Sequence, residues 1–377
     1  MENANDSWPA AALGWLVAPR QERFPAALSD AIAAANSTEV EQFLSLLLAN
    51  LDELPLRDET TSDLPSEEDA SELEPTRTGE GAADSAAAAR ALHRLRTLLQ
   101  MIAARALRLR LETEGQDELQ PAIEPDMIAD LATQLVDDSV LAAAHCLQIL
   151  AAQGDRESLS IFCELIKRQI LDDEQSVAVA MSPLFQWPPP ELASVFEMID
   201  EDVWRWQLLG PLLDLAGHSL RKGKLRTHPL SGQRERLREL LSSTVQRLAR
   251  MEENPQQFGD DVASIQRVLN NAVALTVSLC DAIGLIGDEE AEGKLSQAMS
   301  LSHRRVQTEA SGALARLGKP EGKRRLIELA KDPAARLRAL AYVEELGLED
   351  PELTELRSPY ATAEAEVVSW LADRERF

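Results

Sequence analysis

LCDAIGLIG, beginning at Leu279, is followed along the chain by two variants of the same phrase, ASGALARLG from Ala310 and ALAYVEELG from Ala339. Aligned on Gly287, Gly318 and Gly347, the three segments place small or apolar residues at the same offsets. The glycines recur roughly every 30 residues, a period typical of stacked helical hairpins. One hairpin cannot bury its own apolar stripe, so such units stack on their neighbours. The sequence therefore predicts an all-α fold, an α-solenoid of stacked antiparallel helical hairpins.

The offsets also predict which side chains form the core of each repeat. Apolar residues stand four positions before the glycines, at Ile283, Leu314 and Val343, and directly before them, at Ile286, Leu317 and Leu346. We expect Leu314 and Leu317 to be buried between neighbouring hairpins. Pro320 and Pro333 suit the first turn of the helices that follow the turns, where a missing N–H costs little.

Three regions are predicted along the chain. Residues 1–54 form an N-terminal helical segment, in which Thr38 followed by Glu41 has the spacing of a capping box. Residues 55–83 are acidic, rich in Ser, Thr, Pro and Gly and poor in large apolar residues, which predicts a disordered linker. Residues 84–377 form the solenoid, with the clearest repeats over 270–348. Between those repeats and an earlier echo at Ala142–Leu150, the stretch Leu208–Gly217 fits the pattern only loosely.

The segment Ala310–Gly318, with the amphipathic stretch Arg324–Ala330 after its turn, resembles HEAT repeats. The nearest variety is the bacterial HEAT-like repeat named after phycobilisome lyases, and the whole chain resembles uncharacterised bacterial HEAT-repeat proteins of the planctomycete kind. The resemblance implies the solenoid fold and a scaffolding role. It implies no chemistry, because the repeat is far more widespread than the lyase activity.

Charge is unevenly distributed over the 377 residues, whose net charge is −26. An acidic protein of this kind repels nucleic acid and anionic membranes. One stretch, 221–250, reverses the balance. The basic side chains there that we take as a candidate docking surface for a partner are Arg221, Lys222, Lys224, Arg226, Arg234, Arg236 and Arg238. An ordinary solvated helix face is the alternative explanation of the same pattern.

The sequence contains none of the nucleotide-binding, zinc-protease or serine-hydrolase motifs, and its five histidines are scattered. His145 and Cys146 are neighbours whose side chains diverge on a helix, so we interpret them as a surface histidine beside a buried cysteine. Cys146, Cys163 and Cys280 lack metal-ligand spacing and indicate a reducing compartment. We therefore predict no catalytic residue, cofactor or metal.

Trp187, Trp204 and Trp206 lie close to the prolines 188–190. Tryptophan is a favoured anchor in recognition grooves, but a packed irregular junction between helices explains the cluster equally simply and is our preferred interpretation. No secretory signal pattern precedes the first helix, and the longest apolar stretch, Ala272–Gly287, is too short to cross a bilayer. These features predict a cytoplasmic protein.

Together the patterns predict a non-catalytic, protein-binding scaffold in the cytoplasm whose partner is an unidentified, acidic protein. An enzyme of the bilin-lyase type is one alternative, which would require an accessible thiol or acid in a large pocket. Binding of nucleic acid is another, disfavoured by the net charge of −26 and by an aromatic content of 4%, too low for a stacking platform.

Overall fold

A computed structural model describes residues 7–18, 23–56, 79–113, 123–168, 170–171, 173–197 and 206–374. Over these ranges the chain forms eighteen α-helices and no β-strand. The all-α class predicted from the repeats is confirmed. Most of the predicted acidic linker, residues 57–78, lies outside the described residues.

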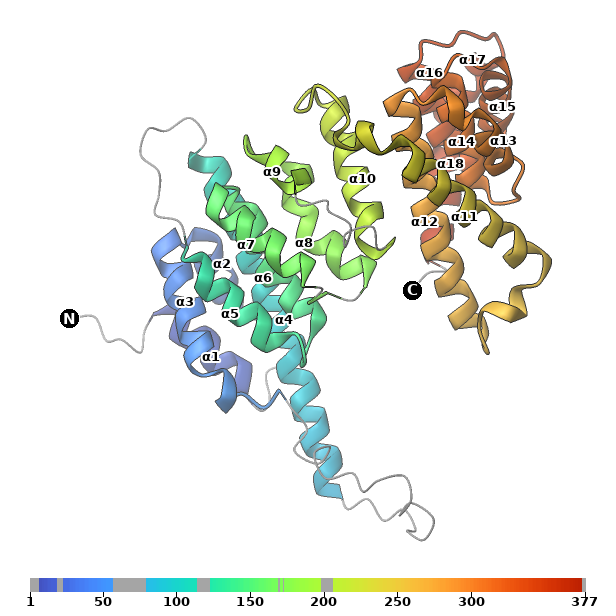
Figure 1. Cartoon of the computed structure of the whole chain (residues 1–377). Helices are drawn as coiled ribbons and strands as arrows, with labels where there is room; N and C mark the ends of the chain where they lie inside the picture. The colour runs from blue at the N-terminus through green and yellow to red at the C-terminus, as the bar shows by residue number, and fades with distance from the viewer. Residues whose placement is uncertain are drawn as a thin grey trace. The chain divides into compact units, whose positions relative to one another are not determined.

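The chain divides into two compact units, Met1–Val203 and Trp204–Phe377, which we call unit 1 and unit 2 (Figure 1). This division differs from the predicted one, which placed everything from residue 84 onwards in one solenoid. It also differs at the N-terminus, because the first three helices pack on α4 and α5 within unit 1 instead of forming a separate segment.

The helices of unit 1 are α1 (Trp8–Val17), α2 (Ala26–Ala34), α3 (Ser37–Ala49), α4 (Gly79–Thr113), α5 (Pro125–Leu135), α6 (Val140–Gln153), α7 (Arg156–Lys167), α8 (Glu174–Gln186) and α9 (Leu192–Glu197). The helix α6 packs on α4, α5, α7 and α8 and lies at the centre of the unit. The last residues of the predicted linker, 79–83, belong to α4, since the helix continues N-terminally through an alanine-rich stretch.

The capping box of α3 is formed by other residues than those predicted. Asn36 is the N-cap residue: the Glu39 N–H donates to Asn36 Oδ1 at 3.0 Å, and the Asn36 N–H donates to Glu39 Oε2 at 2.9 Å. The helix therefore begins at Ser37, and its N-cap lies two residues before Thr38. Asparagine is as good an N-cap as threonine, and the spacing to an acidic residue is the same.

Arginines of α4 hold the C-terminal ends of the first two helices. The buried Arg94 Nη1 donates to the carbonyls of Trp15 at 3.0 Å and Ala18 at 2.5 Å, while its guanidinium lies 5.2 Å from the Trp15 ring. Arg105 Nε donates to the Ala35 carbonyl at 2.7 Å. Both arginines supply donors and positive charge where a helix ends in unpaired carbonyls.

Trp187 belongs to a packed junction. Its ring lies against the turn that follows α6, where a Cβ on Gly154 would come within 2.8 Å of it, and the Arg110 guanidinium lies 4.7 Å from the ring centre. This arrangement favours the packing interpretation over a recognition groove for Trp187. Trp204 and the side chain of Trp206 lie outside the described residues.

Unit 2 contains α10 (Trp206–Arg221), α11 (Arg234–Glu253), α12 (Val262–Ile286), α13 (Glu292–Met299), α14 (Arg304–Arg316), α15 (Pro320–Ala330), α16 (Pro333–Glu345), α17 (Leu353–Leu356) and α18 (Pro359–Arg374). The helices α10, α12, α14, α16 and α18 form one layer, each packed on the next. The odd-numbered helices from α11 to α17 pack against this layer. As predicted, Pro320 and Pro333 lie in the first turns of α15 and α16.

The helix α12 is long and apolar enough to cross a membrane by length and composition alone. In the structure 61% of its most apolar window is buried against other helices of unit 2. Most of this window is therefore packed inside unit 2.

In unit 2, the burial of a side chain depends on its position relative to the repeat glycine. Side chains four residues before the repeat glycines are fully buried, as shown by the 0% exposure of Ile283, Leu314 and Val343. The residues directly before the glycines are only half-buried, so the expectation that Leu317 would be buried is wrong. Leu317 is the C-cap residue that follows α14, where part of its side chain remains open to solvent.

Truncation of Leu314 should destabilise the protein by about 2–5 kcal/mol, the range for deleting a well-packed core leucine. We expect the matched variant Leu317→Ala, three residues away in the same turn region, to cost clearly less because its side chain is half-exposed. Urea denaturation of both variants measures the difference. Equal losses would contradict the packing described for this repeat.

Candidate functional site

Four helices of unit 2 end in the same backbone motif. Each is followed by a glycine in the left-handed conformation, with φ values of 68°, 72°, 80° and 59° at Gly223, Gly287, Gly318 and Gly347. In the last two of these turns, the N–H after the glycine donates to the carbonyl four residues before it, Lys319 to Leu314 and Leu348 to Val343, both at 2.9 Å. Gly223 makes the same bond through Lys224 and Ser219 at 2.9 Å, so α10 is a fourth member of the series.

Counting back from these glycines places mostly polar and small residues on one face of α10, α12, α14 and α16. Positions nine, six and two residues before the glycine are spaced as successive turns of a helix. Taken in the order α10, α12, α14 and α16, the position nine residues before the glycine holds Asp214, Ser278, Glu309 and Arg338. The position six residues before it holds Gly217, Asp281, Gly312 and Ala341, and the position two residues before it holds Arg221, Leu285, Arg316 and Glu345.

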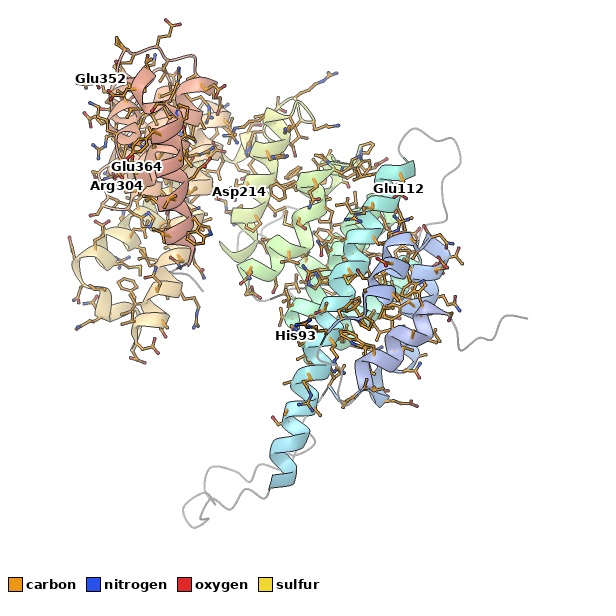
Figure 2. The ribbon with its side chains drawn as sticks, turned by 180° about the vertical axis from the view of Figure 1, so that it is seen from behind. His93, Glu112, Asp214, Arg304, Glu352 and Glu364 are labelled. Atoms are coloured by element: carbon orange, nitrogen blue, oxygen red, sulfur yellow. The ribbon has the colours of Figure 1, made fainter. Side chains whose placement is uncertain are left out.

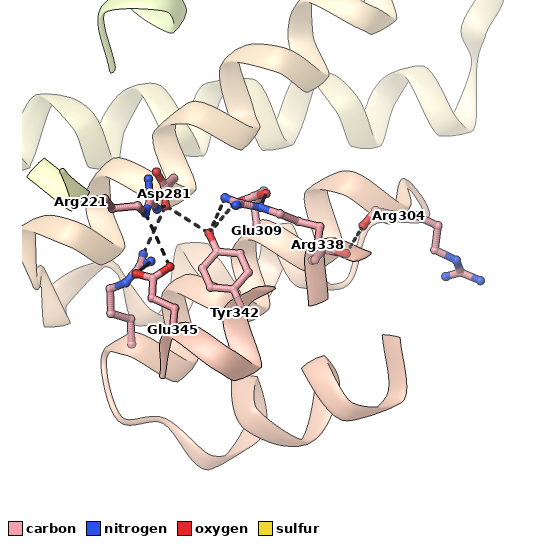
Figure 3. A network of polar contacts seen from close by, with 9 residues as sticks. Arg221, Asp281, Arg304, Glu309, Arg338, Tyr342 and Glu345 are labelled. Carbon is pink, nitrogen blue, oxygen red and sulfur yellow. Dashed lines mark hydrogen bonds and ion pairs between the residues drawn. The ribbon is translucent and has the colours of Figure 1, made fainter. Parts of the chain in front are cut away.

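Asp281 of α12 is the centre of a network on this face (Figure 3). Its Oδ1 accepts from Arg221 Nη2 of α10, from Arg316 Nη1 of α14 at 3.3 Å, and from the Tyr342 hydroxyl of α16 at 3.2 Å. The carboxylate side chain is only 11% exposed, so these donors replace the water that it loses. One side chain thereby joins four helices.

A second set of contacts extends the network along α16. Arg338 binds Glu309 with two parallel bonds, Nε to Oε1 at 2.6 Å and Nη2 to Oε2 at 3.0 Å. The Tyr342 hydroxyl lies 2.5 Å from Glu309 Oε2, and Arg316 Nη2 donates to Glu345 Oε1 at 2.6 Å. The whole network contains three arginines and three carboxylates, so it carries no net charge.

Small residues make room for these groups. A Cβ on Gly312 would lie 2.4 Å from the Tyr342 ring, and one on Gly217 would lie 3.0 Å from Asp281 Oδ2. Tyr342 is 1% exposed, and the guanidiniums of Arg316 and Arg338 lie 5.2 and 4.6 Å from its ring centre. The glycines therefore let a large polar side chain and two cations pack where other residues would collide.

The charges determine the protonation of the central acid. Burial acts to raise the pKa of Asp281, but the hydrogen bond and charge of Arg221, with the charges of Arg316 and Arg338, outweigh it and lower this pKa. Burial, followed by the nearby carboxylates Glu309 and Asp281, raises the pKa of Tyr342 well above its ordinary value. Asp281 is therefore ionised and Tyr342 is a neutral hydrogen-bond donor at neutral pH, which suits a network that holds helices together.

Asp214 lies on the same face of α10. Burial among protein atoms, followed by repulsion from Asp281 and Glu309, raises the pKa of Asp214 to about 6. Protein atoms crowd around Asp214, yet the residue is accessible to solvent (Figure 2). Solvent therefore weakens both the effect of burial and the repulsion from the two carboxylates on this pKa. No described histidine, lysine or cysteine forms a proton-transfer pair with it in the structure.

The predicted basic surface is divided by the structure. Arg221 binds Asp281, and Arg238 Nη1 binds Asp288 Oδ1 at 3.1 Å and Glu290 Oε2 at 2.5 Å. Arg236 is half-buried on α11. The four residues that are exposed and form no ion pair with a described residue are Lys222, Lys224, Arg226 and Arg234. They lie in the turn between α10 and α11 and at the first residue of α11, and we call them the basic turn.

A buried histidine holds the basic turn in place. His228 is 3% exposed, and the Leu230 N–H donates to its Nδ1 at 3.2 Å at the start of the 3₁₀ helix Pro229–Gln233. Burial, only partly offset by the charge of Asp281, lowers the pKa of His228 to about 4. The imidazole is therefore neutral at physiological pH.

The groups considered for chemistry in the sequence are mostly buried. His145 is 6% exposed, not a surface residue as predicted, and its Nδ1 lies 2.9 Å from Gln148 Oε1. All three cysteines are buried, and burial raises the pKa of each thiol, to about 12 for Cys163. The described residues contain no group of three His, Cys, Asp or Glu side chains able to hold a metal ion.

Comparison of the chain with family models, curated proteins and solved structures found no match. The functional argument therefore depends on the residues themselves.

The close contact between Gly312 and Tyr342 predicts that a glycine-to-alanine change there lowers stability, whereas the same change at an open helix position raises it. Gly312→Ala should destabilise the protein by about 1–3 kcal/mol, because the new methyl group would overlap the Tyr342 ring. Gly293→Ala in α13, where nothing lies within 4 Å of the added Cβ, should stabilise it by up to about 1 kcal/mol. Thermal and urea denaturation of both variants would show the contrast, and a stabilising Gly312→Ala would refute the close approach.

The buried His228 should make stability depend on pH. Its pKa of about 4 lies below the ordinary value of 6.5, so the unfolded chain binds more protons between these values and stability falls as the pH drops from 6.5 to 4. The wild type should lose about 3 kcal/mol more over this range than His228→Asn, whose amide oxygen can still accept from Leu230. Urea titrations at several pH values measure this difference; equal losses in both proteins would show that His228 titrates normally.

Proposed function

We propose that this protein is a non-catalytic scaffold whose unit 2 is a HEAT-like α-solenoid, and that the basic turn binds an acidic segment of a partner protein in the cytoplasm. Four helices of one layer share one glycine-terminated turn, and helices of a second layer pack against them, as expected for stacked hairpins. Such stacks present long surfaces built from turns and helix faces, which suit contacts with extended partners.

The proposal that the partner is acidic depends on four exposed cations that form no ion pair with a described residue, Lys222, Lys224, Arg226 and Arg234. Four other arginines of unit 2, Arg221, Arg238, Arg316 and Arg338, are already bound to carboxylates of the same unit. In a protein with a net charge of −26, a local excess of free positive charge is unusual. It favours association with an acidic partner and accelerates the encounter at low salt.

The two alternatives have less support. A bilin-lyase-like enzyme would need a reactive thiol or acid in a large pocket, whereas the three thiols are buried with raised pKa values. Nucleic-acid binding needs a surface whose positive charge outweighs the overall negative charge, together with stacking side chains. The basic turn contains four cations and no aromatic residue.

Affinity capture from the native cells tests the proposal with three forms of the chain. The first is wild type, the second has Lys222, Lys224, Arg226 and Arg234 changed to Gln, and the third has four other exposed or half-exposed cations of unit 2, Arg267, Lys323, Arg324 and Arg357, changed to Gln. The two variants have the same net charge, so a difference between them isolates the position of the charges.

An acidic protein captured by the wild type and the control variant, but lost from the basic-turn variant, is the expected result. The purified complex should then weaken at least about tenfold on neutralisation of the basic turn and should weaken with added salt. The proposal fails if no captured protein depends on the basic turn, or if the component that depends on it is nucleic acid.

A further inference from the structure

The helix α18 has two apolar faces. One consists of small residues that pack within unit 2, including Ala361 and Ala365, which are 9% and 0% exposed. The other carries large apolar side chains that face solvent: Tyr360, Val367, Trp370 and Leu371 are 82%, 56%, 55% and 51% exposed. Half of the eight large hydrophobic side chains exposed in the described residues belong to this one helix.

The exposed side chains form a continuous strip. At 3.6 residues per turn, Tyr360, Ala363, Val367, Trp370 and Leu371 fall within an arc of about 100° on the helix, beside the buried face. A surface helix of a globular protein normally has one apolar stripe of that width, and α18 already uses one against α16. A second exposed stripe of large residues is typical of an interaction site. We call these five residues the outer strip.

The architecture of the layer indicates what kind of element fits the outer strip. Each of α12, α14 and α16 packs on a helix of the same layer on either side, whereas α18 packs on α16 and on the short α17. An amphipathic helix laid along α18 would continue the packing that these helices already make with one another. In helix binding of this type, apolar residues spaced by three and four positions make the contact, and the outer strip has this spacing.

The charged side chains of α18 indicate which kind of helix could bind the outer strip. The two charged side chains described on α18 are carboxylates, Glu364 and Glu366. Glu366 is exposed, and Glu364 remains 45% exposed although it binds Arg336 at 2.7 Å (Figure 2). Pairing of α18 with α18 of a second copy would bring these carboxylates together, no side chain described on α18 is a cation that could offset them, and two chains of charge −26 repel each other. An anionic membrane surface is disfavoured for the same reason.

We propose that the outer strip of α18 binds an amphipathic helix of a partner protein, with an apolar stripe flanked by Lys and Arg side chains that face Glu364 and Glu366. This surface differs in position and in sign from the basic turn, and the proposal does not depend on what binds there. The protein would then join two partners of opposite charge.

Binding of designed peptides to the full-length protein tests the proposal, with isothermal calorimetry as the readout. Three helical peptides of about 18 residues are compared: one with a leucine stripe flanked by Lys, one with the same stripe flanked by Glu, and one with the Lys-flanked composition scrambled to remove the periodicity. Only the first should bind well. Val367→Glu should weaken its binding about tenfold or more, because the change places a charge in the outer strip.

The matched control is Val262→Glu, the same substitution at a valine of α12 that is 82% exposed. It should leave the affinity unchanged, and both variants should keep the wild-type melting temperature because neither side chain is buried. The proposal is overturned if the Lys-flanked peptide does not bind, if the Glu-flanked or scrambled peptide binds equally, or if Val367→Glu has no effect. It is also overturned if light scattering shows a dimer that Val367→Glu abolishes, or if anionic vesicles bind through Val367.

Discussion

A carboxylate largely withdrawn from water, that of Asp281 in α12, contacts side chains from three other helices of unit 2 (Figure 3). An acid in this position without its partners would cost several kcal/mol, because its lost hydration would not be replaced. The helices α10, α14 and α16 must therefore keep the register in which Arg221, Arg316 and Tyr342 reach the same oxygen. Apolar burial would tolerate a small slip between these helices, whereas a network of directed hydrogen bonds would not.

The network around Asp281 also decides which positive charges are paired inside unit 2 and which are left to bind a partner. The arginines that meet Asp281 and Glu309 are neutralised within the layer, and Arg238 is neutralised by Asp288 and Glu290. Four of the seven candidate cations, those of the basic turn, remain without an ion pair, and the buried His228 lies between them in the chain. Exposed acids and exposed apolar residues lie together on α18, at the other end of unit 2 along the chain. The unit thus presents two surfaces of different chemistry, and a scaffold that binds two kinds of partner would use both.

The local features of unit 2 were largely predictable. The helix α12 ends just before Gly287, as the repeat pattern predicted, and it begins after its N-cap residue Asp261. The fourth repeat was missed, because the residues four and five positions before Gly223 are Ser219 and His218 instead of apolar ones. Counting back from Gly223 to Gly217 and Asp214 could have revealed it, since the same face of the other helices carries small and charged residues at those positions. In unit 1, Asn36 was overlooked as the N-cap because two adjacent residues, Ser37 and Thr38, are equally good candidates.

The sequence by itself determined the helical class, the repeat turns and the buried positions that recur with them, because each depends on residues within one or two turns of helix. It could not determine which of seven basic residues are free, since that depends on partners distant in the chain. Arg221 and Asp281 are 60 residues apart, and Arg238 and Asp288 are 50 apart. Only when α10 to α16 are stacked do these charges meet, and their neutralisation leaves the four residues of the basic turn as the members of the seven that are exposed and form no ion pair with a described residue. The exposure of the outer strip was likewise decided by the tertiary structure, because a helix pattern shows that a face is apolar but not whether another helix covers it.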